Sequence, residues 1–193
     1  MKNKLILLVL SFILCFSAVT PVYAESVTSQ DSEFVVSDQL IEQVYEDTGI
    51  DVSNVDVSNF SKEFDFLLND PVFIELEETL ALQSQNAELK EDSVTGQWIP
   101  VVAAALRLLI SQVGKKGMQK GWKVARPYVQ KALKAPQNYI IDGPGSGGRI
   151  IQVRSKKTKK PLFRLDYAPI KHGRPAVLHY HVPPNLKDHH VIF

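Results

Sequence analysis

The sequence predicts an α+β fold, with an acidic helical N-terminal region, a basic helical segment and a small C-terminal antiparallel β-meander. Three observations support this prediction. Two helix patterns with capping signals lie in the first half, an apolar and then basic helical stretch spans 99–134, and strand-like runs follow at 148–155, 161–169 and 174–183. Helix patterns that precede strand patterns are typical of α+β proteins rather than of alternating α/β folds.

The N-terminus predicts secretion. Two lysines form a positively charged start, an apolar run follows, and Val22-Tyr23-Ala24 fits the small-residue pattern of a cleavage site. We therefore expect residues 1–24 to be a signal peptide that is cleaved after Ala24, because the apolar run is shorter than the ~20 residues of a membrane-spanning helix. The single cysteine, Cys15, lies in this segment, so we expect no disulfide-linked partner of the mature chain.

Formal charge divides the mature chain into two parts. Residues 25–92 contain 18 Asp and Glu against two Lys, a charge of −16, whereas residues 93–193 contain 18 Lys and Arg against three Asp, a charge of +15. Such a division predicts an acidic segment beside one that binds nucleic acid or an anionic surface. One hypothesis is that the acidic half folds back over the basic half and masks it.

Capping residues predict two helices in the acidic half. The first helix has Ser37 as its N-cap and ends at Gly49, and the second has Asp70 as its N-cap and Pro71 at its first position. Between them the tetrapeptide DVSN occurs twice over 51–59, where we expect a loop or a short strand.

Composition places the boundaries between the segments. The small polar residues 25–36 are expected to be disordered, and 87–96 is expected to be a linker. The glycine-rich stretch 141–149 lacks the Lys-Ser/Thr of a phosphate-binding loop and is interpreted as a flexible hinge. The predicted organisation is a signal peptide, an acidic region that is partly helical or disordered, a pair of basic amphipathic helices, and a β-rich effector-like domain (1–24, 25–92, 93–136 and 137–193).

The stretch 99–134 has two interpretations. It begins with an apolar helix over 99–113 and continues with glycines among lysines and with Trp122. A basic amphipathic stretch with a tryptophan can lie on a membrane surface, although this apolar part is too short to span a bilayer. The alternative is a hairpin of helices that packs on the strands, since a three-stranded sheet alone is marginally stable.

Alternation along the predicted strands brings four polar side chains together. His179 and His181 share one face of the third strand, whose other face is more apolar and is expected to be the core. Arg164 and Asp166 share one face of the second strand. If the two strands pair with their polar faces aligned, all four side chains converge on the more open face of the sheet.

This set of residues suits phosphodiester chemistry. One imidazole can take a proton from a 2′-hydroxyl while the other protonates the leaving oxygen, because histidine titrates near pH ~6.5. Arg164 can stabilise charge on the phosphate, and Asp166 can orient an imidazole. We therefore predict His179, His181, Asp166 and Arg164 as catalytic residues, with no cofactor required. Nearby cationic residues are predicted to bind the substrate backbone: Arg149, Arg154, Lys156, Lys157, Lys159, Lys160 and His172.

A divalent metal site is the alternative use of the same residues. Two histidines separated by one residue on a strand, together with Asp166, supply ligands for a transition metal. The remaining histidines have a weaker claim to either site. All five lie in the last 22 residues, but His189 and His190 follow a Pro-Pro pair, where the chain is expected either to fold over the sheet or to fray.

The C-terminal segment resembles a known group of toxins. Arg149–Arg154, Phe163–Tyr167 and Leu178–His181 match the motifs R-I-x-Q-V-R, F-R-x-D-Y and L-H-Y-H. These motifs are similar to the C-terminus of a family described as secreted toxins of Gram-positive bacteria and, more broadly, to effector modules of polymorphic toxins. The resemblance covers about 45 to 90 residues and implies a toxin activity. This chain departs from the pattern at Ala168, where a histidine is expected.

Three classes of function follow from these patterns. The first is a secreted toxin that acts on RNA or DNA as a nuclease, with an immunity protein as an expected partner. The second is a membrane-active toxin that uses the amphipathic stretch 99–134 on anionic bilayers. The third is a non-enzymatic secreted protein whose basic face binds anionic cell-wall polymers.

Overall fold

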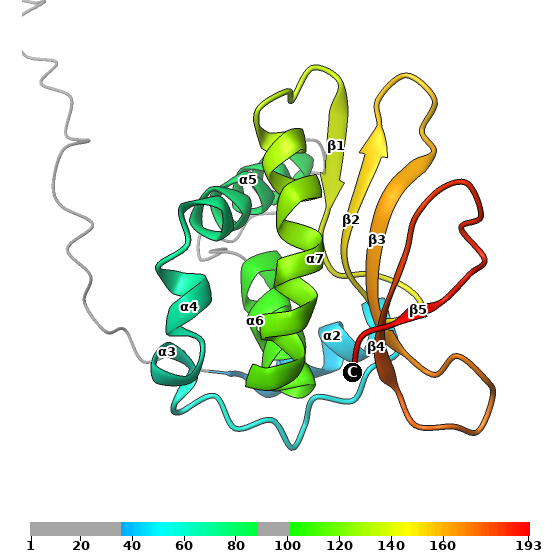
Figure 1. Ribbon diagram of the computed structural model, residues 1–193. Coiled ribbons are helices and arrows are strands. Elements are labelled where there is room, and N and C mark those ends of the chain that lie inside the picture. Colours follow the sequence, from blue (N-terminus) through cyan, green and yellow to red (C-terminus); the bar gives the residue numbers. More distant parts are fainter. Residues whose placement is uncertain (1–35, 89–100) are drawn as a thin grey trace, which may run out of the picture. The chain divides into compact units, whose positions relative to one another are not determined.

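The computed structural model describes residues 36–88 and 101–193 and confirms the predicted α+β fold (Figure 1). The described part of the chain has six helices: α2 (Asp38–Thr48), α3 (Phe60–Glu63), α4 (Asp65–Leu68), α5 (Pro71–Glu88), α6 (Val101–Val113) and α7 (Lys115–Leu133). Its strands are β1 (Tyr139–Asp142), β2 (Arg149–Ser155), β3 (Pro161–Ala168), β4 (Val177–His181) and β5 (His190–Val191). The expected signal peptide, residues 25–35 and most of the expected 87–96 linker lie outside the described residues.

Both helix starts in the acidic half are confirmed. The Ser37 hydroxyl accepts a hydrogen bond from the Leu40 N–H at 3.2 Å, and α2 ends at Gly49, which adopts φ 75°. At the start of α5, Asp70 Oδ1 accepts from the Val72 N–H at 2.9 Å. Side-chain caps of this kind satisfy backbone donors that have no partner inside the helix.

The repeated DVSN sequence forms a loop with two matching turns. The Ser53 N–H donates to Asp51 Oδ1 and the Ser58 N–H donates to Asp56 Oδ1, both at 2.9 Å. An aspartate that accepts from the backbone two residues onward is typical of a turn. The repeat therefore reflects the same local turn made twice.

The five strands form one antiparallel sheet in the order β1-β2-β3-β4-β5, which is a meander. The three predicted strands correspond to β2, β3 and β4. The interpretation of 141–149 as a flexible hinge is wrong at its start, because Ile141 and Asp142 belong to β1 and pair with β2. Arg149 at its other end is the first residue of β2, and residues 143–148 form the short connection of the β1–β2 hairpin, with Gly145 bridged to Arg149.

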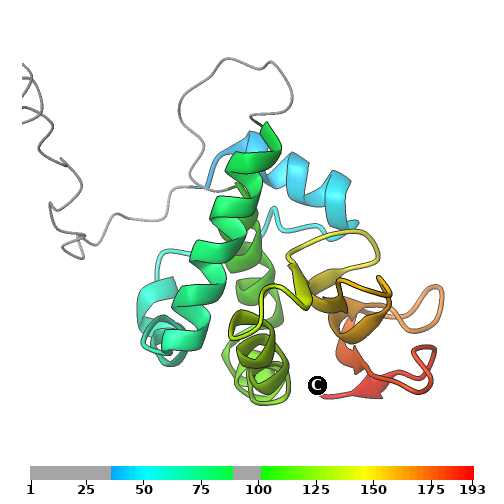
Figure 2. The same cartoon turned by 90° about the horizontal axis from the view of Figure 1, so that it is seen from above.

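Helix α7 packs along one side of the sheet and α6 packs beside it, as expected for a helix hairpin (Figures 1 and 2). Tyr128 stacks on Phe163 of β3 with ring centroids 4.5 Å apart. A Cβ atom at Gly121 would lie 2.9 Å from Cδ2 of Leu178, so glycine allows α7 to approach β4 closely. Among the described residues, no helix has the length and apolarity needed to cross a membrane.

The acidic and basic halves share one hydrophobic core that extends from Val44 to Leu178, and the described residues 36–88 and 101–193 belong to one compact unit. Ion pairs join the halves at the edge of this core. Asp70 Oδ2 accepts from Arg126 Nε at 2.6 Å and from Trp122 Nε1 at 2.9 Å. The core contains residues from all three expected segments of the mature chain, 25–92, 93–136 and 137–193. Neither half can therefore bury its apolar surface without the other.

Gly148 connects the acidic half with the sheet through its backbone. Its N–H donates to Thr48 O at 3.0 Å, its carbonyl accepts from the Tyr167 N–H at 2.8 Å, and its φ is 72°. A Cβ atom here would overlap the Tyr167 carbonyl oxygen. We expect Gly148→Ala to lower the free energy of unfolding by more than about 2 kcal/mol, since left-handed backbone alone costs non-glycine residues about 1–2 kcal/mol.

Gly173→Ala is the matched control, measured by urea denaturation of residues 25–193. Gly173 has φ 74° but no atom within 4 Å of its Cβ position, so it should lose only the backbone contribution. Equal losses in the two variants would contradict the close approach at Gly148.

Asp70 provides a pH-dependent test of the contact between the halves. Burial raises the pKa of its carboxyl, but hydrogen bonds from Arg126, Trp122 and Val72 outweigh burial and leave the pKa below its ordinary value. Asp70→Ala should lower the free energy of unfolding by about 2 kcal/mol near pH 7, because it removes a helix cap and charge-assisted hydrogen bonds. Since a lowered folded pKa stabilises above the unfolded pKa, this difference should shrink as pH falls below about 4.

Urea denaturation at pH 7 and pH 3 measures the Asp70 effect. Glu78→Ala, an exposed substitution on the same helix, should change the stability little at either pH. If Asp70→Ala lowers the free energy of unfolding equally at pH 7 and pH 3, the charge of Asp70 does not contribute to the contact between the halves.

Candidate functional site

The pairing of β3 with β4 brings the four predicted catalytic residues together. Arg164 lies opposite His181, and Asp166 lies opposite His179. The alternation that turns Phe163, Leu165 and Leu178 into the core places these polar residues on the opposite face. The predicted convergence on one face is therefore confirmed.

Asp166 is the centre of this group. Its Oδ1 accepts from Arg164 Nε at 2.6 Å, and its Oδ2 lies 3.2 Å from His181 Nε2 and 3.9 Å from His179 Nε2. Arg164 also donates from Nη2 to the Ser146 carbonyl at 3.1 Å. With only 3% of its surface exposed, the Asp166 carboxylate depends on these neighbours, because a buried charge without partners is strongly unfavourable.

The expectation that the histidines lie on an open face is wrong. His179 is 2% exposed and His181 is 8% exposed. The chain turns back after Pro183 and Pro184, and β5 pairs beside β4, with the Ile192 N–H donating to Leu178 O at 2.8 Å. The C-terminal residues therefore do not fray: they fold back along the edge of the sheet and join it as its fifth strand, instead of lying over its face.

Burial and a backbone contact define the state of His179. Desolvation lowers the pKa of its imidazole, outweighing a favourable contact with the Val177 carbonyl and the charge of Asp166. Its Nδ1 lies 2.9 Å from Val177 O. Because a carbonyl only accepts hydrogen bonds, we assign the proton to Nδ1, which leaves Nε2 with a free lone pair at neutral pH.

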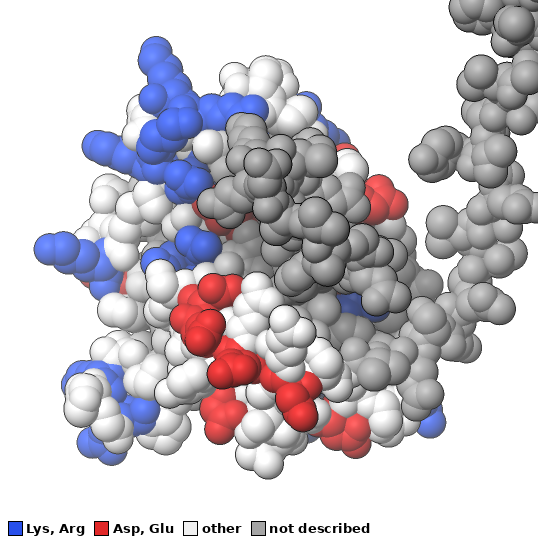
Figure 3. Space-filling model, turned by 180° about the vertical axis from the view of Figure 1, so that it is seen from behind, with Lys and Arg blue, Asp and Glu red and all other residues white. Residues whose placement is uncertain are grey.

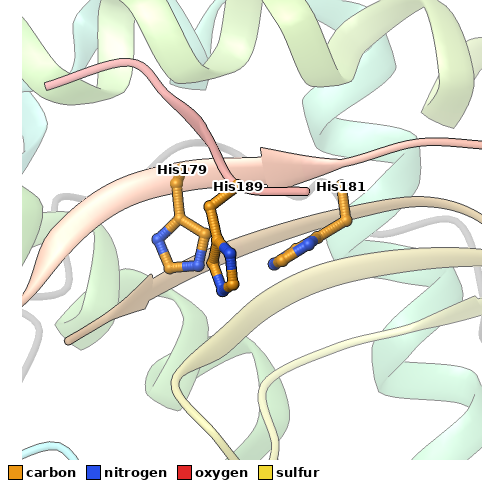
Figure 4. Close-up of side chains that lie close together, drawn as sticks. All are labelled: His179, His181 and His189. Atoms are coloured by element: carbon orange, nitrogen blue, oxygen red, sulfur yellow. The ribbon is translucent and has the colours of Figure 1, made fainter. Parts of the chain in front are cut away.

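His189 belongs to the cluster, although the sequence pattern indicated a weaker claim to the site for it than for His179 and His181. Its ring centroid lies 5.0 Å from that of His179 and 4.7 Å from that of His181. Figure 4 shows the three imidazoles side by side, with the His181 ring directed toward the other two. The three histidines could hold a metal ion, since one nitrogen from each lies within 4.8 Å of the others.

The sequence contains a signal for His189 that depends on strand pairing. Val191 lies opposite His179, and His190 lies opposite Tyr180. The same register places His189 across from His181, so an antiparallel return of the tail predicts the triad. A two-residue strand is too short to be recognised from periodicity alone.

The other two histidines lie elsewhere. The His190 ring stacks on Tyr180 with centroids 4.8 Å apart, on the other side of the sheet from the cluster. His172 is exposed in the loop between β3 and β4, outside the triad, although it was predicted to bind substrate.

The two predicted substrate-binding arginines of β2 are engaged within the protein. Arg154 Nη2 donates to Asp142 Oδ1 at 2.6 Å, and Gln152 Nε2 donates to Asp142 Oδ2 at 2.9 Å. Arg149 Nε donates to Gly143 O at 2.9 Å, and burial lowers the pKa of its guanidinium. Both arginines therefore fix the β1–β2 hairpin, and Asp142 is a partner of Arg154 that the strand patterns did not predict.

The four predicted substrate-binding lysines are exposed in the turn between β2 and β3: Lys156, Lys157, Lys159 and Lys160. Arg164 is the fourth residue after Lys160, which corresponds to about 13 Å along a strand. In Figure 3, Lys and Arg side chains gather on the side of the sheet and its loops, while Asp and Glu form a separate band. A polyanion that reached the histidine cluster could thus extend over these lysines.

The acidic helices make their described ion pairs with α6 and α7 rather than with the cluster. Glu77 Oε1 accepts from Arg107 Nε at 2.7 Å, which parallels the Asp70–Arg126 pair. Among the described residues, Asp166 is the only acidic residue that forms an ion pair with Arg164 or with a histidine of the cluster. Attraction between the halves therefore contributes to the fold at a distance from the candidate site.

Comparisons of the chain with protein-family models, with curated proteins and with solved structures find no match. The assignment of a function therefore depends on the geometry of the sheet face.

Proposed function

We propose that this chain is a secreted toxin that cleaves phosphodiester bonds in RNA or DNA at the polar face of its sheet. The observation that carries this proposal is the convergence of the three imidazoles, Asp166 and Arg164 on one face. Proton transfer and stabilisation of a phosphate oxygen are the two tasks of phosphodiester cleavage, and these side chains are suited to them.

Two mechanisms can use this face. Without a metal, Nε2 of neutral His179 would take the proton of an RNA 2′-hydroxyl, whose oxygen would then bond to the phosphorus. His181, beside Asp166, would protonate the 5′-oxygen that leaves as its bond to phosphorus breaks. With a divalent metal, the imidazoles would act as ligands, and the cation would activate a water molecule. Arg164 would stabilise the phosphate in either case.

Access to the site favours a flexible or single-stranded substrate. His179 and His181 are buried, whereas His189 is exposed, so the substrate would approach from the side of the C-terminal segment. A polymer chain that passes His189 could place flanking phosphates near the lysine turn between β2 and β3. Contacts with flanking phosphates would supply affinity without sequence preference.

Two earlier expectations support the same proposal. The N-terminal pattern predicts export, and the motifs of β2, β3 and β4 resemble those of secreted toxins of Gram-positive bacteria. A toxin of this kind requires protection of the producing cell, and the basic loops of the sheet would suit an acidic immunity protein.

The alternative functions make different demands on the structure. The apolar residues Leu106, Leu109 and Ile110 of α6 are fully buried, so action on a membrane would require the core to open. Binding of anionic cell-wall polymers would use the exposed lysines and would not require the imidazole cluster. A mask formed by the acidic half would have to reach the cluster through contacts other than the described ion pairs with α6 and α7.

Replacing the clustered histidines tests the proposed reaction. His179→Gln, His181→Gln and His189→Gln should each lower the cleavage rate of RNA or DNA by at least about 100-fold, because each removes a group that transfers protons or binds a metal. Residues 25–193 would be assayed with labelled single-stranded oligonucleotides, with EDTA and with added divalent ions.

His190→Gln is the control, since this residue stacks on Tyr180 away from the cluster and should keep its activity. Thermal unfolding of each variant would separate loss of chemistry from loss of fold, and the exposed His189 is the position least coupled to folding. Absence of cleavage by the unaltered chain under every metal condition would reject the nuclease proposal.

The lysine turn is tested by the salt dependence of binding. Replacing Lys156, Lys157, Lys159 and Lys160 with Ser should flatten the slope of log K against log salt concentration by up to about 3, since each phosphate contact on a single strand contributes about 0.7. Fluorescence anisotropy in the His181→Gln background would keep the oligonucleotide intact.

Four lysines of α7 provide a control of equal charge. Replacement of Lys116, Lys120, Lys123 and Lys131 with Ser removes the same charge from exposed positions of this helix. If the two variants change the slope equally, the turn has no specific role and net charge alone governs binding.

A further inference from the structure

We infer that His179, His181 and His189 form a binding site for a divalent transition-metal ion such as Zn²⁺, with Asp166 beside it. The ligands come from two consecutive segments of the chain: His179 and His181 lie on β4, and His189 directly precedes β5. The site therefore exists only when the C-terminal segment is paired beside β4, so that His189 lies next to His179 and His181 (Figure 4).

The distances are compatible with a metal after a small adjustment. One ring nitrogen of each histidine lies within 4.8 Å of the others. Tetrahedral zinc with Zn–N bonds of about 2.0–2.1 Å requires ligand nitrogens about 3.4 Å apart. Rotation of the imidazoles, and above all of the exposed His189, can supply the remaining contraction of up to about 1.4 Å.

His179 already has the arrangement of a metal ligand. Its Nδ1 is held 2.9 Å from the Val177 carbonyl, so Nε2 faces the cluster with a lone pair. Metal-binding histidines commonly donate their second ring nitrogen to a carbonyl or carboxylate, which fixes the ring and its tautomer. The backbone of β4 itself provides this contact.

His181 supplies the second, independent indication of a ligand. Its Nδ1 is buried and has no hydrogen-bond partner among the described residues, while its Nε2 lies 3.2 Å from Asp166 Oδ2. A buried polar atom without a partner costs about 1–3 kcal/mol and calls for a bound water or ion. The neighbouring carboxylate would balance the charge of a dication.

The donor set selects the class of metal. Three neutral imidazoles suit zinc, copper, nickel or iron, whereas Mg²⁺ and Ca²⁺ prefer carboxylate and carbonyl oxygens. Three protein nitrogens also leave one tetrahedral position for water or substrate, as in catalytic zinc sites. Use of this position for phosphodiester cleavage rests on the proposed function, whereas metal binding does not.

A bound metal would also fix the C-terminal segment. The described contacts of β5 with β4 include two backbone hydrogen bonds near its end, Leu178 N–H to Phe193 O at 2.9 Å and Ile192 N–H to Leu178 O at 2.8 Å. Coordination of His189 would add a link between this segment and β4 at the site. The metal thus couples ligand binding to the order of the last residues.

Calorimetric titration tests the inference directly. Residues 25–193 would be purified without a polyhistidine tag, treated with EDTA and dialysed, then titrated with Zn²⁺ and separately with Mg²⁺. We expect one equivalent of Zn²⁺ to bind, no competition by Mg²⁺, and slower amide exchange over 190–193 in the zinc-bound protein. His189→Gln should weaken the Kd for Zn²⁺ at least about 10-fold, while His190→Gln should leave it unchanged.

Several results would overturn the site. These are no saturable Zn²⁺ binding, an unchanged Kd in His189→Gln, or retained binding in the variant with Gln at positions 179, 181 and 189. Co²⁺ absorption provides a second readout, because a tetrahedral spectrum that is lost only in the cluster variants supports the site. Zinc binding without nuclease activity would support the site and reject the proposed function, whereas nuclease activity in EDTA without zinc binding would do the reverse.

Discussion

The packing of α7 against the sheet is the constraint on which the rest of the structure depends. Gly121 allows the helix backbone to approach Leu178, and Tyr128 stacks on Phe163. Because side chains alternate along a strand, burial of these residues commits their neighbours to the other face. The positions of Arg164, Asp166, His179 and His181 thus follow from apolar packing on the opposite side, and a shift of one residue in either strand would disperse them.

The opposite charges of the two halves stabilise the fold through ion pairs between them. Asp70 and Glu77 of the acidic half bind Arg126 and Arg107 at the edge of a common core, and Gly148 joins the backbone of α2 to the sheet. Acidic and basic residues that are separated along the chain therefore pair with each other where the helices pack. The cations that remain exposed gather on the side of the sheet and its loops, apart from the band of Asp and Glu side chains (Figure 3).

The candidate site combines a buried centre with an exposed entrance. Asp166, His179 and His181 are fixed by neighbouring strands, whereas His189 stands on the C-terminal segment and is exposed. A rigid pair of ligands and a third on a terminal segment would allow metal binding to be coupled to closure of that segment. The same arrangement would keep the reactive groups away from bulk water until a substrate or cation enters.

The sequence alone determined the fold class, the caps at Ser37 and Asp70, and the three central strands, because capping and alternation are local signals. It also determined the convergence of Arg164, Asp166, His179 and His181, since alternation and antiparallel pairing fix which residues share a face. Only the tertiary structure decided that β1 extends into the expected hinge and ends there at Asp142, that Asp142 neutralises Arg154, and that the C-terminal segment pairs beside β4 and adds His189 to the cluster. These features depend on how neighbouring strands pair, which the pattern of a single strand does not specify, and a two-residue strand has no periodicity that could reveal it.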